Sequence, residues 1–260
     1  MRDPAGSPAG VHATTAGVPG PSESLESLFA RHAPRDGVGQ LSPDALELLR
    51  TTGSTEVTVT VVVGDLRLSG FVLKEAIHPA LFARFIIGFT EAVRGLTHAN
   101  DGWFDKFTGD GFISFWIHQA AYGREVARIP GFCQAVLPAS ETLVANLRAN
   151  SRNFPLGVGL SLGADSGPCE LARVGEALTL IGGPIVGATR MVAGASANRL
   201  VANVLLGQAL ERDRTALEER GIRIRRTNVR TKEYPAGQEA FELAFPVRPR
   251  DAASSPRPFR

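Results

Sequence analysis

Apolar and polar residues follow two periods along the chain, and each period predicts its own kind of element. Over residues 55–63 polar and β-branched residues alternate and then become continuously apolar, which predicts a strand that becomes buried on both faces. Over residues 79–96 large apolar residues recur at helical spacing, which predicts an amphipathic helix. Aromatic-rich runs at 102–108 and 112–116 flank Gly109-Asp110-Gly111 and predict a β-hairpin.

Weaker patterns predict the remaining elements. Ser42-Pro43-Asp44 is a typical helix start, because the serine caps, the proline fits the first turn and the aspartate complements the helix dipole. The other expected elements are helices near 24–31, 131–150, 186–197 and 207–220, and strands at 156–163, 170–174, 222–229 and 240–245. The order β, α, hairpin, α, β predicts an α+β fold, an antiparallel sheet with helices on one face.

Composition separates the two ends of the chain from its middle. Residues 1–22 are rich in Pro, Gly, Ala and Ser and lack large apolar side chains, so we expect a disordered leader. We expect a second disordered segment, a tail, at 247–260. Between them we predict a short helical segment at 23–53 and one folded domain at 54–246, as a chain of 260 residues allows.

Charge and cysteine content exclude several classes of protein. Lysines and arginines exceed acidic residues by only two, and the one basic cluster, at 223–230, is too sparse for a nucleic-acid-binding face. The two cysteines, Cys133 and Cys169, form neither a disulfide framework nor a CxxC motif. Neither a secretory signal nor an apolar run of about 18 residues occurs. We therefore expect a cytoplasmic protein without membrane insertion or direct nucleic-acid binding.

Two aspartates are the candidates for chemistry. Asp65 ends the buried strand and Asp110 lies at the hairpin tip, so pairing of strand and hairpin would bring both carboxylates to one end of the sheet. Carboxylates that close repel each other unless a divalent cation lies between them. Each aspartate alone is more often a solvated loop or turn residue than a metal ligand. Gly64, Gly109 and Lys106 beside them favour a metal site.

The segments that hold these aspartates resemble a known family. Val-Val-Gly-Asp-Leu-Arg at 62–67 and Gly-Trp-Phe-Asp-Lys-Phe-Thr-Gly-Asp-Gly at 102–111 resemble the two metal-aspartate segments of the class III adenylate/guanylate cyclase catalytic domain. Residues 157–163 and 179–190 are similar to the strand before the substrate-specifying segment, and to that segment with its helix. The resemblance covers roughly residues 56–245 and implies the family's ferredoxin-like, palm-type fold.

The resemblance implies a role for each matching position. Asp65 and Asp110 would bind the metal ions, and Lys106 and Thr179 would select the base. Arg190 would be the transition-state arginine, and Lys232 would hold the terminal phosphates. Two Mn²⁺ or Mg²⁺ ions would be the cofactors, and the ribose 3′-hydroxyl would attack the α-phosphorus as pyrophosphate leaves. In the family the aspartates come from one subunit and the other groups from its partner, which implies a homodimer.

Three positions depart from the family pattern. Val186 stands where the family has an asparagine that orients the ribose, and valine cannot donate a hydrogen bond. Either the ribose is held differently or turnover is slow. The segment 68–71 differs from the usual Gly-Phe-Thr, although its backbone N–H groups could still cradle phosphates. Glu233 follows Lys232 where glycine is usual, which weakens the match of that lysine.

The resemblance leaves the substrate open. Lys106 with Thr179 favours adenine in ordinary relatives, yet Val186 and the altered segment 68–71 set the chain apart from the usual purine cyclases. In its overall organisation, without a fused sensor domain, the chain resembles the stand-alone bacterial pyrimidine cyclases of antiphage defence. That comparison predicts conversion of UTP to cyclic UMP, which would act on a separate effector protein. The alternatives are an adenylate cyclase and a non-catalytic nucleotide-binding or dimerisation module, which Val186 favours. A diguanylate cyclase would carry Gly-Gly-Asp/Glu-Glu-Phe at the hairpin, where Thr108-Gly109-Asp110-Gly111-Phe112 stands.

Overall fold

The computed structural model describes residues 24–119, 125–231 and 234–246. The expected leader at 1–22 and tail at 247–260 lie outside the described residues, and so does Lys232. Within the described residues, none of the helices is long and apolar enough to span a membrane.

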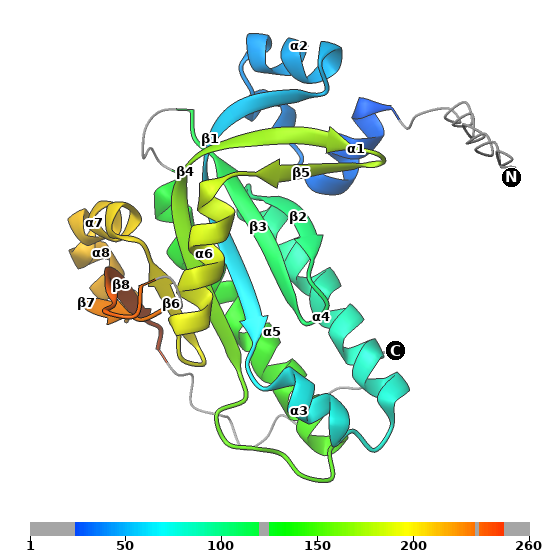
Figure 1. The fold of residues 1–260 in the computed structure, drawn as a ribbon, viewed down its shortest axis with the longest axis vertical. Helices are drawn as coiled ribbons and strands as arrows, with labels where there is room; N and C mark the ends of the chain where they lie inside the picture. Colours follow the sequence, from blue (N-terminus) through cyan, green and yellow to red (C-terminus); the bar gives the residue numbers. More distant parts are fainter. Residues whose placement is uncertain (1–23, 120–124, 232–233, 247–260) are drawn as a thin grey trace, which may run out of the picture.

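An eight-stranded sheet forms the centre of the molecule (Figure 1). Its strands are β1 (Ser54–Leu66), β2 (Trp103–Phe107), β3 (Gly111–Ile117), β4 (Leu160–Val174), β5 (Ala177–Ile181), β6 (Arg199–Ala202), β7 (Arg223–Val229) and β8 (Gln238–Ala244). They lie in the order β2-β3-β1-β4-β6-β8-β7, and β5 pairs with the far end of β4. Every pair is antiparallel except β4 with β6, which is parallel.

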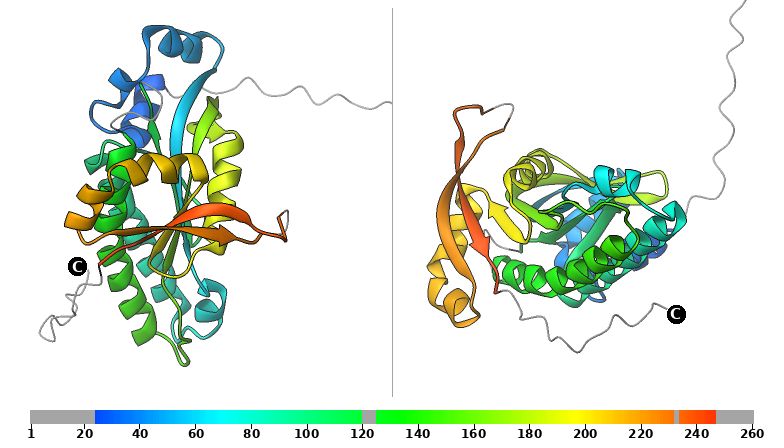
Figure 2. Two further views of the ribbon diagram at one scale, coloured as in Figure 1. Left: turned by 90° about the vertical axis from the view of Figure 1, so that its left-hand side faces the viewer. Right: turned by 90° about the horizontal axis from the view of Figure 1, so that it is seen from below.

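Helices cover both faces of the sheet, as the right-hand view of Figure 2 shows end-on. They are α1 (Leu25–His32), α2 (Pro43–Thr51), α3 (Ser69–Lys74), α4 (Pro79–Ala99), α5 (Ile129–Ala149), α6 (Gly183–Gly194), α7 (Val204–Arg212) and α8 (Arg214–Glu219), with short 3-10 turns η1 (Gly37–Gln40) and η2 (Val126–Arg128). One core lies between the sheet and α4 with α5, and a second lies between the sheet and α1, α2 and α6.

The central strand β1 supplies both cores by simple alternation. Val62 and Leu66 belong to the core under α4 and α5, while Val61 and Val63 belong to the core under α6. The same alternation places Asp65 on the α6 face, two positions beyond Val63, where the strand leaves the core. Because this buried strand ends directly after Asp65, the carboxylate lies at one end of the sheet.

The predicted α+β class is confirmed, and two details of the sheet are corrected. The sheet is mixed rather than purely antiparallel, because β6 runs parallel to β4. Helices lie on both faces rather than one, because α6 follows β5 back over the sheet. Both departures have one cause: the chain passes from β5 to β6 through α6, which covers the second face of the sheet and lets β6 run parallel to β4.

Several element boundaries also differ from the sequence patterns. The two strands expected at 156–163 and 170–174 are one continuous strand, β4, which runs through Pro168. Proline is tolerated there because β6 pairs only with residues 161–164 and β5 only with 170–174, so the strand has an open side between them. The helix expected at 207–220 is two helices, α7 and α8. The structure also adds α3, β5 and β6, which no pattern predicted.

The N-terminal helices are part of the same core rather than a separate unit. Leu28 of α1 and Leu49 of α2 are fully buried in the α6-side core. Phe29 packs edge-on against Trp103 at a centroid distance of 5.8 Å, and Trp103 in turn stacks on Phe115 of the neighbouring strand. The segment 24–53 therefore covers the open end of the β2-β3 hairpin, away from the turn that contains Asp110.

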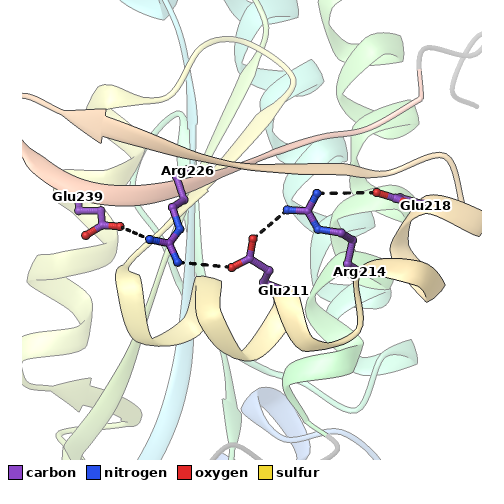
Figure 3. Close-up of polar contacts among 5 residues, drawn as sticks. All are labelled: Glu211, Arg214, Glu218, Arg226 and Glu239. Carbon is purple, nitrogen blue, oxygen red and sulfur yellow. Dashed lines mark hydrogen bonds and ion pairs between the residues drawn. The ribbon is translucent and has the colours of Figure 1, made fainter.

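Two arginines of the cluster at 223–230, Arg225 and Arg226, pair with glutamates. Arg226 lies 3.3 Å from Glu239 across the β7-β8 hairpin and 3.9 Å from Glu211 on α7, which also pairs with Arg214 (Figure 3). These pairs lie at the surface, so each contributes about 0 to 1 kcal/mol. They tie the hairpin to α7 and α8 and reduce the positive charge of this surface.

Candidate functional site

The two candidate metal aspartates meet at one end of the sheet. In the register of β1 with β3, Asp65 faces Gly111, so Asp110 in the preceding turn is its neighbour across the strands. Glycine is required at position 111 because a Cβ there would lie 2.2 Å from the backbone oxygen of Gly64. This close approach of the two strands brings both carboxylates to one place.

The surroundings of the two carboxylates favour a bound cation. Burial raises the pKa of Asp65, the charge of Asp110 raises it further, and Arg67 lowers it in part. The Arg67 guanidinium is held by the Ala195 carbonyl at 2.7 Å. Asp110 accepts a hydrogen bond from the Ser69 hydroxyl at the start of α3, which orients its carboxylate. The negative charges of Asp65 and Asp110 therefore repel each other, and Arg67 balances them only in part.

These donors fit a hard divalent ion such as Mg²⁺ or Mn²⁺. Both are carboxylates, and no cluster of three or more His, Cys, Asp or Glu side chains suited to a metal occurs in the described part of the chain. Mg²⁺ is commonly bound by one or two carboxylates together with water and substrate phosphates. A pair of aspartates at the end of the central strands matches that requirement and does not match a closed structural metal centre.

The two candidate base-selecting residues are also brought together. Lys106 on β2 donates a hydrogen bond to the Thr179 hydroxyl on β5, with 2.7 Å between Nζ and Oγ1. The strands β4 and β5 make this contact possible, because their hairpin turns back over the sheet toward β2. Lys106 is half-exposed, so an ammonium donor and a hydroxyl stand side by side at an accessible surface.

A third polar residue of this group, Asp105, was missed by the sequence reasoning. Its carboxylate is buried, and Oδ2 lies 3.6 Å from the Lys106 ammonium. Burial raises the pKa of Asp105, and Lys106 and Thr179 offset this only in part. An acidic residue beside Lys106 in a strand whose other residues are all aromatic was the available signal in the sequence.

Arg190 and Val186 lie one helical turn apart on α6. The Arg190 guanidinium is 5.9 Å from the ring centroid of Tyr234, which lies between β7 and β8 in the sequence. Val186 is 50% exposed, so an apolar side chain faces solvent at the position where the resembled cyclases have asparagine. The structure thus forms three groups within one chain: the Asp65 pair, the Lys106 pair, and Arg190 beside the β7-β8 hairpin.

A half-buried carboxylate, Asp165, lies between β4 and α6. Asp165 of β4 accepts hydrogen bonds from the Ser166 amide and the Asn203 side chain, and it presses against Gly187 of α6. Burial raises the pKa of Asp165 to about 6, and the two hydrogen bonds only partly oppose that rise. Asp165 therefore helps to place the helix that holds Arg190.

Comparison with known proteins identifies the fold. By sequence, neither a family model nor a curated protein matches the chain. By structure, the chain is similar to the adenylyl cyclase CyaB of P. aeruginosa, with TM-score 0.62, 17% identity, and 75% of this chain and 97% of that one covered. It is also similar to the guanylyl cyclase Cya2, with TM-score 0.61, 13% identity and coverage of 76% and 98%. A third neighbour is the guanylate cyclase domain of RhGC from Catenaria anguillulae, solved in complex with GTP, with TM-score 0.58, 12% identity and coverage of 74% and 98%. The chain therefore has the fold of the adenylyl and guanylyl cyclase catalytic domains.

Proposed function

We propose that the protein is a nucleotidyl cyclase, which converts a nucleoside triphosphate into a 3′,5′-cyclic nucleotide and pyrophosphate. The observation that carries this proposal is the meeting of Asp65 and Asp110 at one edge of a cyclase-like sheet. A fold of this kind serves several functions, so the site must carry the argument. The carboxylate pair, Lys106 with Thr179, and Arg190 supply the kinds of groups that phosphoryl transfer from a nucleotide requires.

Each residue has a defined task in the proposed mechanism. Asp65 and Asp110 would hold two divalent ions, whose chemistry is to activate the attacking hydroxyl and neutralise charge on the phosphates. Ser69 keeps the Asp110 carboxylate in position. Arg190 would stabilise the negative charge that grows on the α-phosphoryl oxygens, since a fixed guanidinium needs no reorganisation during the reaction. Lys106 and Thr179 would contact the base.

The arrangement of these groups supports a homodimer with shared sites. Within one chain, Asp65 and Arg190 belong to separate groups, and in the resembled family each site takes one group from each subunit. Val186, in the first turn of α6, is 50% exposed, and Ile181, the last residue of β5, is 56% exposed. A second copy of the chain would cover such apolar side chains while completing both sites.

Mixing two inactive variants tests the shared site. Asp65→Asn and Arg190→Ala are each expected to be inactive, yet a heterodimer of the two retains one intact site. Equimolar mixing with random re-pairing should therefore restore about a quarter of wild-type activity, because half of the dimers regain one site of two. Sedimentation of the wild type should show a dimer. An active protein that sediments strictly as a monomer would refute the shared site.

For the substrate we propose UTP, with cyclic UMP as a messenger for a separate effector in antiphage defence. The support is the valine at position 186 and the altered segment 68–71, which depart from the pattern of purine cyclases. ATP is the alternative, favoured by the contact of Lys106 with Thr179. A nucleotide-binding or dimerisation module is the non-catalytic alternative, and exposed Val186 at the ribose position favours it.

Incubation of purified protein with Mn²⁺ and each of ATP, GTP, CTP and UTP, followed by mass spectrometry, separates these proposals. We expect cyclic UMP to be the main product. Cyclic AMP instead would refute the pyrimidine assignment and leave the cyclase assignment intact. The absence of product from all four, together with measurable triphosphate binding, would favour the binding module.

A further inference from the structure

Asp105 is the least satisfied buried charge near the proposed base site. Its side chain is fully buried, and neither carboxylate oxygen reaches a hydrogen-bond partner in the described parts of the chain. Leaving a buried polar group without a hydrogen bond destabilises the folded state, and a charged group more than a neutral one. Such a cost is expected at functional sites, where stability is given up for activity.

A β-bulge explains why Asp105 lies beside Lys106. Successive side chains of a regular strand point to opposite faces, which would separate the two residues. In β2 the pairing with β3 shifts register between Phe104 and Lys106, so Asp105 is the extra residue. Bulges of this kind redirect a side chain, and here the carboxylate turns toward the face where Lys106 meets Thr179.

The side chains of Asp105, Lys106 and Thr179 lie next to one another, from the interior to the surface. Asp105 is innermost, Lys106 is half-exposed, and Thr179 on β5 accepts the lysine's hydrogen bond at 2.7 Å. An ammonium group has three protons to donate. With one directed to Thr179 and one toward Asp105, the third is left for a ligand at the open side.

We propose that Asp105 is the positioning residue of the base site. It holds the Lys106 ammonium from the buried side and thereby fixes the hydrogen-bond donor that contacts the base. This inference rests on the proposed function. The fixed ammonium offers one oriented donor, and the Thr179 oxygen keeps a lone pair for a base N–H. A mobile lysine would accept any base with an acceptor atom, so loss of the anchor should broaden base preference.

Asp105→Asn is the direct test, because it keeps the shape of the side chain and removes its charge. We expect the preference for the best triphosphate over the next best, measured as the ratio of kcat/KM values, to fall about tenfold. KM should change more than kcat, because Asp105 does not touch the reacting phosphate. The melting temperature should change little, because the attraction lost to Lys106 is offset by the lower cost of burying a neutral amide. Asp36→Asn, an exposed aspartate that makes no capping hydrogen bond, is the matched control.

A double-mutant cycle with Lys106→Met shows whether Asp105 acts through the lysine. If it does, Asp105→Asn should have no further effect on base preference once the lysine is gone. Equal effects with and without the lysine, or an unchanged preference in Asp105→Asn, would overturn the inference while cyclase activity of the wild type upholds the proposed function.

A wild type without turnover leaves the same ratio measurable as equilibrium binding of the four triphosphates in the presence of Ca²⁺. A loss of binding preference in Asp105→Asn would then support the inference although the proposed activity had failed. Absence of both turnover and binding would overturn the proposed function and the inference together.

Discussion

Asp65→Asn is expected to lower cyclase turnover by about a thousandfold, and Asp110→Asn by a similar factor, because each removes half of the charge that would hold the metal ions. The folded structure should survive both changes. Asp65 is only half-buried, and its pKa is raised by burial and by the charge of Asp110, so its ionised form is disfavoured in the folded protein. A neutral amide removes that repulsion, and the free energy of unfolding should be unchanged or slightly higher.

Two measurements separate loss of metal from loss of structure. Binding of Mn²⁺, followed by electron paramagnetic resonance, should weaken in both variants, while urea unfolding should match the wild type. Asp36→Asn provides the control for an aspartate outside the site. If both variants kept more than about a tenth of wild-type turnover, the two-metal assignment would be wrong.

Gly163→Ala is expected to destabilise the protein by about 3 kcal/mol and to impair activity as well, because overpacking forces backbone to move. A Cβ at position 163 would lie 2.2 Å from both the Ala188 oxygen and the Val192 nitrogen, which are backbone atoms of α6. The helix must therefore shift away from β4. Since α6 holds Arg190, the arginine would move with it.

Gly95→Ala is the matched control for this change. Gly95 lies in the exposed face of α4, and nothing lies within 4 Å of a Cβ built there. Alanine should stabilise the helix by about 1 kcal/mol. Urea unfolding of both variants, with turnover measured in parallel, checks the pair. Wild-type stability of Gly163→Ala would show that α6 does not rest on this glycine.

The contacts around Asp165 show where sequence reasoning stops being sufficient. Nothing near Asp165 in the sequence marks it as part of a strand packed under a helix, because Ala-Asp-Ser-Gly-Pro at 164–168 is typical of a turn. Pairing with the long strand β1 draws these residues into an extended conformation, and the side chain then meets α6 and Asn203, 38 residues away. Local composition carries no information about that partner.

The elements that the sequence determined by itself are those with strong local patterns. The central strand, the aromatic hairpin and the long helix α4 follow from side-chain period and from the Asp-Gly turn, which act over a few residues. The adjacency of Asp65 and Asp110 follows from them, because a hairpin beside a strand leaves few alternatives. The roles of these residues remain predictions.

Tertiary structure alone decided how the second half of the site is assembled. Lys106 and Thr179 are 73 residues apart and meet only because β5 turns back over the sheet. Asp105 joins them because one register shift in β2 redirects its side chain. Strand pairing and bulges depend on which distant segment offers hydrogen bonds, so their outcome is set by long-range packing rather than by the residues at hand.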